Sequence, residues 1–262
     1  MFKVIKKIMK YPRLTLKYPK EPMNFSAFIG KPIIDAEKCT KCGECLNRCP
    51  SGAIAFHPQT GIPGFNLDAC IVCALCEEVC PAGAITMSNE FELAERNKAS
   101  LRVESVQVND ETASEESYEE LGERLAQKIR KKFGRSLQIR EVDAGSCNAC
   151  DNEINTTNNP FNDIERFGIH FVASPRHADM LLVTGTATRN MELALLKTYE
   201  AAPNPKLVVA VGACACSGGI FRDSYATKNG IDCLLPVDVY IPGCPPRPQA
   251  ILYGILKAID KI

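Results

Sequence analysis

Residues 39–56 read CTKCGECLNRCPSGAIAF, and residues 70–87 read CIVCALCEEVCPAGAITM. Each run has three cysteines separated by two residues, then a fourth cysteine that proline follows directly. The tripeptide GAI recurs shortly after each proline. Tandem duplication of one short unit is the simplest origin of this pattern. We therefore expect two similar halves that fold around their cysteines.

The cysteine spacing is that of the bacterial two-cluster ferredoxin run, in which the fourth cysteine ligates the other cluster. One [4Fe–4S] cluster is accordingly assigned to Cys39, Cys42, Cys45 and Cys80. The second is assigned to Cys70, Cys73, Cys76 and Cys49. Pro50 and Pro81 fix the backbone just past each run. A pair of zinc sites fits less well, because zinc sites normally pair separated knuckles.

The composition agrees with metal binding. The chain has 262 residues and 14 cysteines, with no net formal charge. Its cysteines are clustered, and the N-terminal stretch has no apolar signal-peptide core, so metal ligands are favoured over disulfides. Residues 1–30 are basic, but no block has the dense basic character expected of a nucleic-acid binder, and we expect no nucleic-acid partner. No stretch approaches the roughly 20 apolar residues of a membrane-spanning helix.

The chain divides into three zones. Residues 1–100 are expected to form an N-terminal extension and an α+β two-cluster ferredoxin domain, and residues 101–116 a linker. Residues 117–262 are expected to form an α/β flavodoxin-like domain. That domain should open with a helix over residues 117–133, where Ser117 and Glu120 have capping-box spacing.

The second domain alternates strand-like and helix-like segments, which predicts a mostly parallel sheet with helices on both faces. The expected strands are SLQIREV (136–142), IHFVAS (169–174), DMLLVTG (179–185), KLVVAVG (206–212) and VDVYIPG (237–243). Residues 191–202 and 248–262 are helical candidates.

Four further cysteines follow these strands. Cys147 and Cys150 come after the first, Cys214 after the fourth, and Cys244 after the fifth. The carboxyl ends of parallel strands meet at one rim of the sheet, so the four thiolates are expected to lie together. They could hold a third iron–sulfur cluster or a zinc ion.

Four segments resemble the small subunit of group 4 membrane-bound [NiFe] hydrogenases, of the formate hydrogenlyase and energy-converting type, and the related cluster-bearing subunit of complex I. They are GSCNACDNEI (145–154), SPRHADMLLVTG (174–185), GACACSGGIF (212–221) and LPVDVYIPGCPPRP (235–248). Residues 1–100 separately resemble the two-cluster ferredoxin subunit of the same complexes, which is usually another chain. Complex I has adjacent cysteines where this chain has Cys147-x-x-Cys150, and this difference favours the hydrogenase.

The resemblance implies a third [4Fe–4S] cluster at Cys147, Cys150, Cys214 and Cys244. It implies an electron-transfer subunit of an oxidoreductase, peripheral on the cytoplasmic side of a membrane. The expected partners are a low-potential donor such as ferredoxin, the [NiFe] hydrogenase large subunit and membrane-embedded subunits. The chain has no nickel-ligand set of its own, so we expect no catalytic residue in it. The alternative is the same role in a quinone- or sulfur-reducing complex without nickel.

Several residues carry weaker expectations. Cys216 is interpreted as a buried neighbour of the ligands, and Cys233 as a core residue. Glu153 either assists proton transfer or partner contact, or has a structural role. His177 is interpreted as structural, with contact to a catalytic partner as the alternative. MFKVIKKIMK (1–10) has an apolar and a lysine-bearing side, and it is expected to dock on a partner subunit, with a membrane surface as the alternative.

Overall fold

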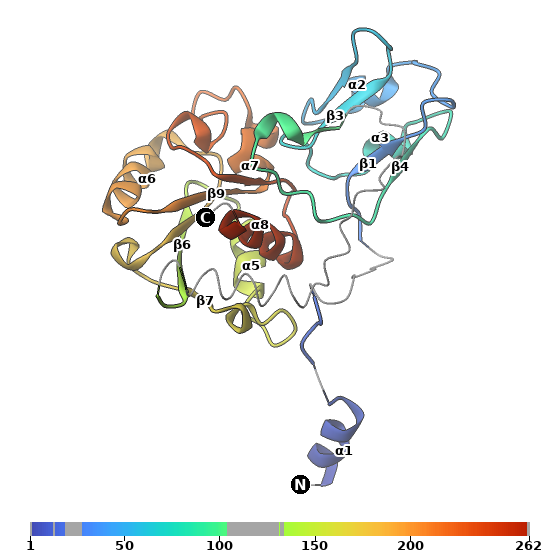
Figure 1. The fold of residues 1–262 in the computed structure, drawn as a ribbon. Helices are drawn as coiled ribbons and strands as arrows, with labels where there is room; N and C mark the ends of the chain where they lie inside the picture. Colours follow the sequence, from blue (N-terminus) through green and yellow to red (C-terminus); the bar gives the residue numbers. More distant parts are fainter. Residues whose placement is uncertain (1, 13, 19–27, 104–130, 132–133, 261–262) are drawn as a thin grey trace.

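The computed structural model describes residues 2–12, 14–18, 28–103, 131 and 134–260. The helix predicted over residues 117–133 lies outside these residues apart from Lys131. Figure 1 shows an α/β part, formed by residues 134–260, beside a smaller part that contains residues 28–103.

The α/β part is built on a five-stranded sheet in which every strand pairs in parallel with its neighbours, in the order β10-β9-β8-β6-β7. The strands are β6 (Leu137–Asp143), β7 (Ile169–Phe171), β8 (Met180–Thr184), β9 (Leu207–Val211) and β10 (Val239–Ile241). This is the flavodoxin-type order, whose switch point lies between β6 and β8. The predicted fold class is confirmed. Four strands fall within the segments predicted for them, and β6 extends one residue beyond its segment, to Asp143.

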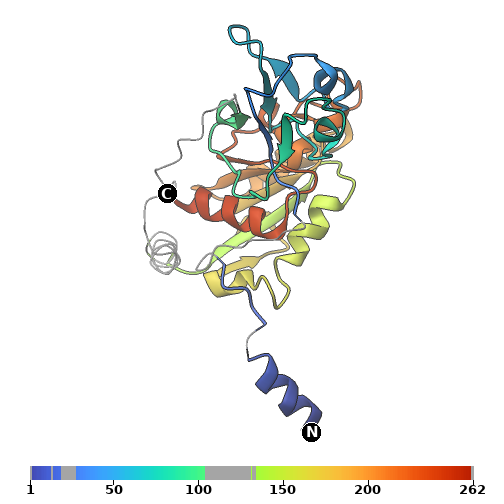
Figure 2. The same cartoon turned by 90° about the vertical axis from the view of Figure 1, so that its right-hand side faces the viewer.

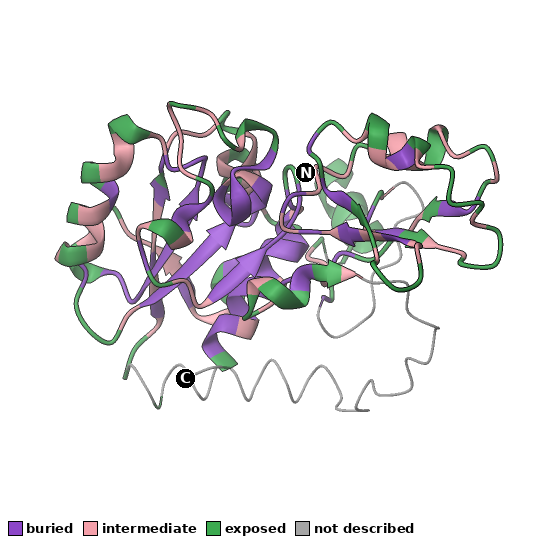
Figure 3. Ribbon diagram, turned by 90° about the horizontal axis from the view of Figure 1, so that it is seen from above, coloured by how far each residue is buried: buried purple, intermediate pink, exposed green. Residues whose placement is uncertain are grey.

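Both faces of the sheet are covered by helices. Along β9, Leu207, Val209 and Val211 belong to one core cluster, whereas Val208 and Ala210 belong to another. The first core includes α8 (Pro248–Asp260) and Ile154 of α5 (Ala149–Thr156). The second includes parts of α6 (Arg189–Ala201) and α7 (Gly212–Ser217). Figure 3 shows the sheet buried between these layers, with α6 exposed on its outer side. An all-apolar strand such as LVVAV is typical of this two-sided burial.

The smaller part has two antiparallel sheets and two short helices, as predicted for an α+β ferredoxin domain. One sheet pairs β1 (Pro32–Ile34) with β4 (Ile85–Met87). The other has the order β2-β3-β5, formed by β2 (Ile54–Phe56), β3 (Pro63–Asn66) and β5 (Arg102–Val103). The helices are α2 (Glu44–Arg48) and α3 (Leu75–Glu78), one in each repeat. Within the predicted linker, residues 101–103 are described, and β5 completes this second sheet.

Short 3-10 turns complete the described elements. They are η1 (Lys98–Leu101), η2 (Ile164–Phe167), η3 (Pro175–His177), η4 (Gly219–Phe221) and η5 (Ile231–Cys233).

The two parts are joined through the outer edge of the parallel sheet. Glu95 pairs in antiparallel fashion with Tyr240 of the edge strand β10, with N–H to O distances of 2.9 and 2.7 Å. The Lys257 ammonium on α8 donates to the carbonyl of Ala94 at 2.6 Å and lies 2.9 Å from the Glu95 carboxylate. Leu101 is fully buried in the second core of the α/β part. The segment after the repeat therefore covers a sheet edge that would otherwise be unpaired.

An N-terminal helix, α1 (Phe2–Lys10), projects from the α/β part on the side away from the cysteine repeat (Figures 1 and 2). The residues that follow this helix are hydrogen-bonded to the α/β part. The Leu16 N–H donates to the Phe161 carbonyl at 2.7 Å, and Arg166 donates to the carbonyls of Leu16 and Tyr18. Tyr18 is buried, and its hydroxyl donates to Glu92 at 2.8 Å. Among the described residues, no helix is long and apolar enough to cross a membrane.

Candidate functional site: three cysteine quartets

Three separate cavities are each lined by four cysteines, and these are the groupings expected from the sequence. The distal quartet is Cys39, Cys42, Cys45 and Cys80. The middle quartet is Cys49, Cys70, Cys73 and Cys76. The rim quartet is Cys147, Cys150, Cys214 and Cys244.

The distal and middle quartets are built from equivalent backbone in the two repeats. The loops between cysteines turn through left-handed residues at equivalent positions, Lys41 and Gly43 in the first run and Val72 and Ala74 in the second. Non-glycine residues rarely adopt a positive φ, so the surrounding loop must hold them there. These turns bring successive cysteines of one run around the same cavity.

The fourth cysteine of each run serves the other run's cavity. The Ala53 N–H donates to Cys49 Sγ, and the equivalent Ala84 N–H donates to Cys80 Sγ, both at 3.3 Å. Each of these cysteines follows a short helix that carries it away from its own run. These two hydrogen bonds are equivalent, so Cys49 and Cys80 occupy corresponding positions in the two repeats.

The rim quartet collects the loops at the carboxyl ends of the parallel strands. Cys147 lies in the loop after β6, Cys150 in α5, Cys214 in α7 after β9, and Cys244 just after β10. The cavity between them has a volume of about 310 Å³. Cys147 and Cys244 are exposed. The cavity therefore opens toward solvent, where a partner could reach it.

A glycine permits the close approach at this rim. Gly212 has a φ of +89°, and a Cβ built there would lie 2.7 Å from Cys150 Sγ. Only glycine leaves room for both the left-handed backbone and the sulfur.

Hydrogen bonds hold the loop between Cys147 and Cys150 to the sheet. Asp151 accepts from the Ser146 hydroxyl at 2.5 Å and from the Thr184 hydroxyl on β8 at 2.8 Å. Asp143 accepts from the backbone N–H groups of Gly145 and Ser146, at 2.8 and 2.7 Å. The first two rim cysteines are thus fixed from both ends of their loop.

A second carboxyl group meets Asp151. Burial, followed by the hydrogen bond to Asp151 and its charge, raises the pKa of Glu141 to about 7. Burial alone would raise the pKa of Asp151, but hydrogen bonds from Ser146, Thr184 and Glu141 hold it below its ordinary value. The two pKa values are therefore shifted in opposite directions, and Glu141 keeps its proton to a higher pH than Asp151 does. Nothing in the sequence pointed to this pair, because Glu141 occupies an ordinary polar position on a strand.

The cysteines within a quartet influence one another's titration. Burial, then the neighbouring Cys70, Cys73 and Cys49, raises the pKa of Cys76 to about 12. Burial, then Cys244 and Cys147, raises the pKa of Cys214 to about 11. These thiols are protonated at neutral pH, whereas metal ligands are thiolates, so metal binding would release protons.

Among the described residues, no three cysteine, histidine or acidic side chains converge closely enough to share a single metal ion. Each quartet instead surrounds a cavity. A cubane takes one thiolate at each of four irons, so it requires sulfurs spread around a body of several atoms. Four sulfur donors around a cavity fit a [4Fe–4S] cluster, and in the distal and middle quartets a backbone N–H also donates to the exchanged cysteine.

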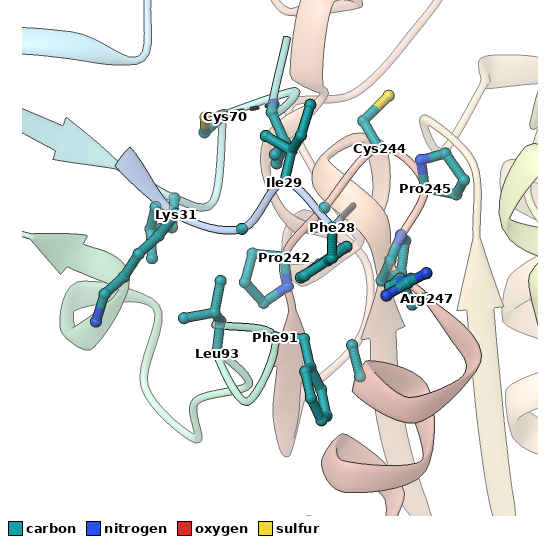
Figure 4. Close-up of a pocket in the computed structure, with 16 residues that line it drawn as sticks. Phe28, Ile29, Lys31, Cys70, Phe91, Leu93, Pro242, Cys244, Pro245 and Arg247 are labelled. Atoms are coloured by element: carbon teal, nitrogen blue, oxygen red, sulfur yellow. Dashed lines mark hydrogen bonds between the residues drawn. The ribbon is translucent and has the colours of Figure 1, made fainter. Parts of the chain in front are cut away.

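The middle and rim quartets share a neighbouring cavity of about 280 Å³ that is lined by both Cys70 and Cys244. Figure 4 shows these two cysteines on either side of Ile29, with Phe28 and Pro242 nearby. The Arg247 guanidinium stacks on the Phe28 ring at 4.4 Å from the centroid. Arg247 belongs to the PGCPPRP motif, but its place in this cavity was not foreseen from the sequence.

Two remaining cysteines differ from each other. Cys216 is fully buried, and its Sγ lies 3.6 Å from the Ile241 carbonyl, as expected for a buried neighbour of the ligands. The prediction that Cys233 is a core residue is wrong, because its side chain is exposed. The tight turn of η5 directs Ile231 and Leu235 inward and leaves Cys233 outward.

Glu153 and His177 lie in different surroundings. Burial raises the pKa of Glu153, and the charge of Arg247 opposes this effect. His177 is exposed in η3, which directly precedes β8. It therefore lies at the amino-terminal edge of the sheet, opposite the rim cysteines.

A duplicated ferredoxin-type repeat joined to a flavodoxin-type domain, with three four-thiolate cavities, defines an iron–sulfur electron-transfer protein. Comparison with known proteins agrees in both parts. Residues 31–90 match the 4Fe-4S dicluster domain, and residues 147–258 match the NADH ubiquinone oxidoreductase 20 kDa subunit. The chain belongs to the family of that 20 kDa subunit, with a dicluster domain fused ahead of it.

Three relatives illustrate the range of the family. The probable membrane-bound hydrogenase subunit mbhJ of Pyrococcus furiosus is 50% identical over 143 residues, which cover 54% of this chain and 84% of mbhJ. Formate hydrogenlyase subunit 7 of Escherichia coli is 53% identical over 129 residues, 49% of this chain and 51% of that protein. A subunit of the NADH-quinone oxidoreductase of Geobacter metallireducens is 57% identical over 113 residues, 43% of this chain and 66% of that protein. The chain thus spans only about half the length of the formate hydrogenlyase subunit.

Proposed function

We propose that this chain is the electron-transfer subunit of a membrane-bound [NiFe] hydrogenase complex. It would connect a low-potential donor, such as a ferredoxin, to a partner subunit that holds the Ni–Fe centre and reduces protons, or works in reverse. The observation that carries this proposal is the series of three cysteine quartets in one chain, two of which flank a shared cavity.

The twelve cysteines of the distal, middle and rim quartets are the proposed ligands of three [4Fe–4S] clusters. When bound, such clusters supply one-electron carriers whose potentials depend on burial, charge and hydrogen bonds to sulfur. The chain's own contribution is to hold the thiolates and to direct N–H groups at them. Ala53 and Ala84 do so for the two exchanged cysteines.

The two ends of the series suit different partners. Cys42 of the distal quartet is exposed, so a diffusing donor could approach there. Cys147 and Cys244 are exposed at the rim, and Phe221 beside them is 46% exposed. An apolar surface around the last site in the series suits a stable partner subunit.

Two similar proteins favour a hydrogenase partner, since their names are formate hydrogenlyase subunit 7 and probable membrane-bound hydrogenase subunit mbhJ. The Cys147-x-x-Cys150 spacing also matches the hydrogenase form. In this proposal the chain is peripheral on the cytoplasmic side, bound to membrane-embedded subunits, and the catalytic centre lies on another chain.

A second candidate is the same role in a quinone- or sulfur-reducing complex without nickel. The 57% identity to a subunit of an NADH-quinone oxidoreductase favours it. Both candidates need the same three clusters, so the metal content of the partner separates them.

The deciding experiment measures nickel and iron by elemental analysis on the native complex, isolated anaerobically and scaled to this chain. We expect about one nickel, and at least about twelve irons from three four-iron clusters. The same iron content without nickel would support the second candidate, a quinone- or sulfur-reducing complex. Far less iron, with zinc in its place, would overturn the electron-transfer proposal.

A further inference from the structure

The helix α1 has two chemically distinct sides. A helix advances about 100° per residue, so the order FKVIKKIMK separates its apolar and basic residues completely. The apolar side carries Phe2, Val4, Ile5, Ile8 and Met9. The opposite side carries Lys3, Lys6, Lys7 and Lys10.

The apolar side of α1 has no covering within the described structure. No residue of the helix is buried, and Phe2, Ile8 and Met9 are 89, 61 and 72% exposed. A contiguous exposed apolar stripe bordered by charge marks a binding surface rather than a random exposure of single side chains.

The charge of this region indicates what covers the stripe. Residues 1–20 contain six lysines, one arginine and no acidic residue. An anionic membrane surface complements such a segment. The apolar side of α1 would insert at the boundary between headgroups and acyl chains, and the lysines would contact the anionic headgroups. Binding of an interfacial amphipathic helix increases with the apolar area that it buries and with its attraction to anionic lipids, and α1 supplies both. At roughly 14 Å the helix is too short to cross the bilayer, so it would lie in the interface.

We propose that α1 is a docking element for an anionic lipid surface. The attachment of Leu16 and Tyr18 to Phe161 and Arg166 connects the helix to the α/β part. Figures 1 and 2 show α1 on the opposite side of the molecule from the cysteine repeat. Docking through α1 therefore leaves the distal quartet facing away from the lipid, where a soluble donor has access.

The test uses the full-length, cluster-loaded chain and sedimentation with vesicles. One set contains phosphatidylcholine alone, and the other contains equal parts phosphatidylcholine and phosphatidylglycerol. We expect at least about ten-fold tighter binding to the anionic vesicles, weakened by salt, because each lysine near the surface contributes roughly five-fold. Ile5→Glu and Lys6→Glu should each reduce that binding.

The control is Leu193→Glu, which places an acid on an exposed leucine of α6; Leu193 is 62% exposed and Ile5 is 45% exposed. It should bind as the wild type does, and cluster absorbance should be unchanged in all variants. Equal binding to both vesicle types, or full binding by Ile5→Glu, would overturn the proposal. Binding that requires a membrane-embedded partner protein would also overturn it and assign α1 to that protein. None of these outcomes depends on nickel, so the test is independent of the hydrogenase proposal.

Discussion

Cys70 of the middle quartet and Cys244 of the rim quartet line the same cavity, although they come from different domains. Burial raises the pKa of Cys70 to about 11, and Cys244 adds to the rise together with Cys49 and Cys73. The pKa of the Cys70 thiol is therefore raised by cysteines of both the middle quartet and the rim quartet. This proximity is what the proposed electron path across the fusion requires.

The exchange of the fourth cysteines between the repeats predicts a difference between two double variants. Cys39→Ser with Cys80→Ser removes two ligands of one quartet, so about four irons per chain should be lost. Cys39→Ser with Cys49→Ser removes one ligand from the distal quartet and one from the middle quartet, so about eight irons should be lost. Iron analysis with EPR of the reduced protein distinguishes them. Equal losses would refute the exchanged assignment.

Cys214 and Cys216 provide a matched pair in one helix. Cys214→Ser should remove the rim cluster, about four irons, and leave the signals of the other two clusters unchanged. Cys216→Ser should keep all three, because its sulfur lies in the core near the Ile241 carbonyl. Iron content and EPR report both results, and cluster loss in the Cys216 variant would show that the rim ligands are assigned incorrectly.

Gly212→Ala should disrupt the rim site through a steric clash. The new Cβ would lie 2.7 Å from Cys150 Sγ on a backbone with a φ of +89°. We expect a lost or altered rim EPR signal. Gly168→Ala is the control, because it also has a positive φ, of +71°, but no atom within 4 Å of its Cβ. If both variants behave alike, backbone strain rather than the sulfur contact is responsible.

The raised pKa of Glu141, about 7, predicts a pH-dependent stability. The folded state keeps this proton between about pH 4.5 and 7, where the unfolded chain releases it, so this group lowers stability as pH rises through that window. Glu141→Gln cannot ionise and should be more stable than the wild type at about pH 8. The gain should be about 1 kcal/mol, less than the full pKa shift implies, because the side chain is only partly buried. Thermal unfolding from about pH 5 to 8 would expose the trend, and a pH-independent difference would contradict it.

Leu101 links the sheet of the repeat to the core of the α/β part. It is 1% exposed and belongs to the second α/β core. Leu101→Ala should lower the free energy of unfolding of the α/β part by about 2–5 kcal/mol. Near-UV circular dichroism during denaturation measures this change. Leu193→Ala, at an exposed site, should change stability by less than about 0.5 kcal/mol.

The sequence by itself carried much of the fold and the grouping of the candidate ligands. Apolar runs such as LVVAV indicated strands buried on both sides, and parallel strands place their following loops at one rim. That rule is enough to gather Cys147, Cys214 and Cys244 without coordinates. In each cysteine run the first three cysteines were grouped by their short spacing, and the fourth was assigned to the other run from the two-cluster ferredoxin pattern.

The tertiary structure decided what depends on packing between distant segments. The pairing of Glu95 with Tyr240 fixes the repeat against the sheet edge and brings Cys70 near Cys244, and no local pattern encodes that contact. The outward position of Cys233 depends on how η5 turns. The opposite pKa shifts of Glu141 and Asp151 depend on the packing of two carboxyl groups from different elements. Spacing along the chain thus grouped the cysteines within each site, whereas long-range packing determined which sites are neighbours and how their surroundings are charged.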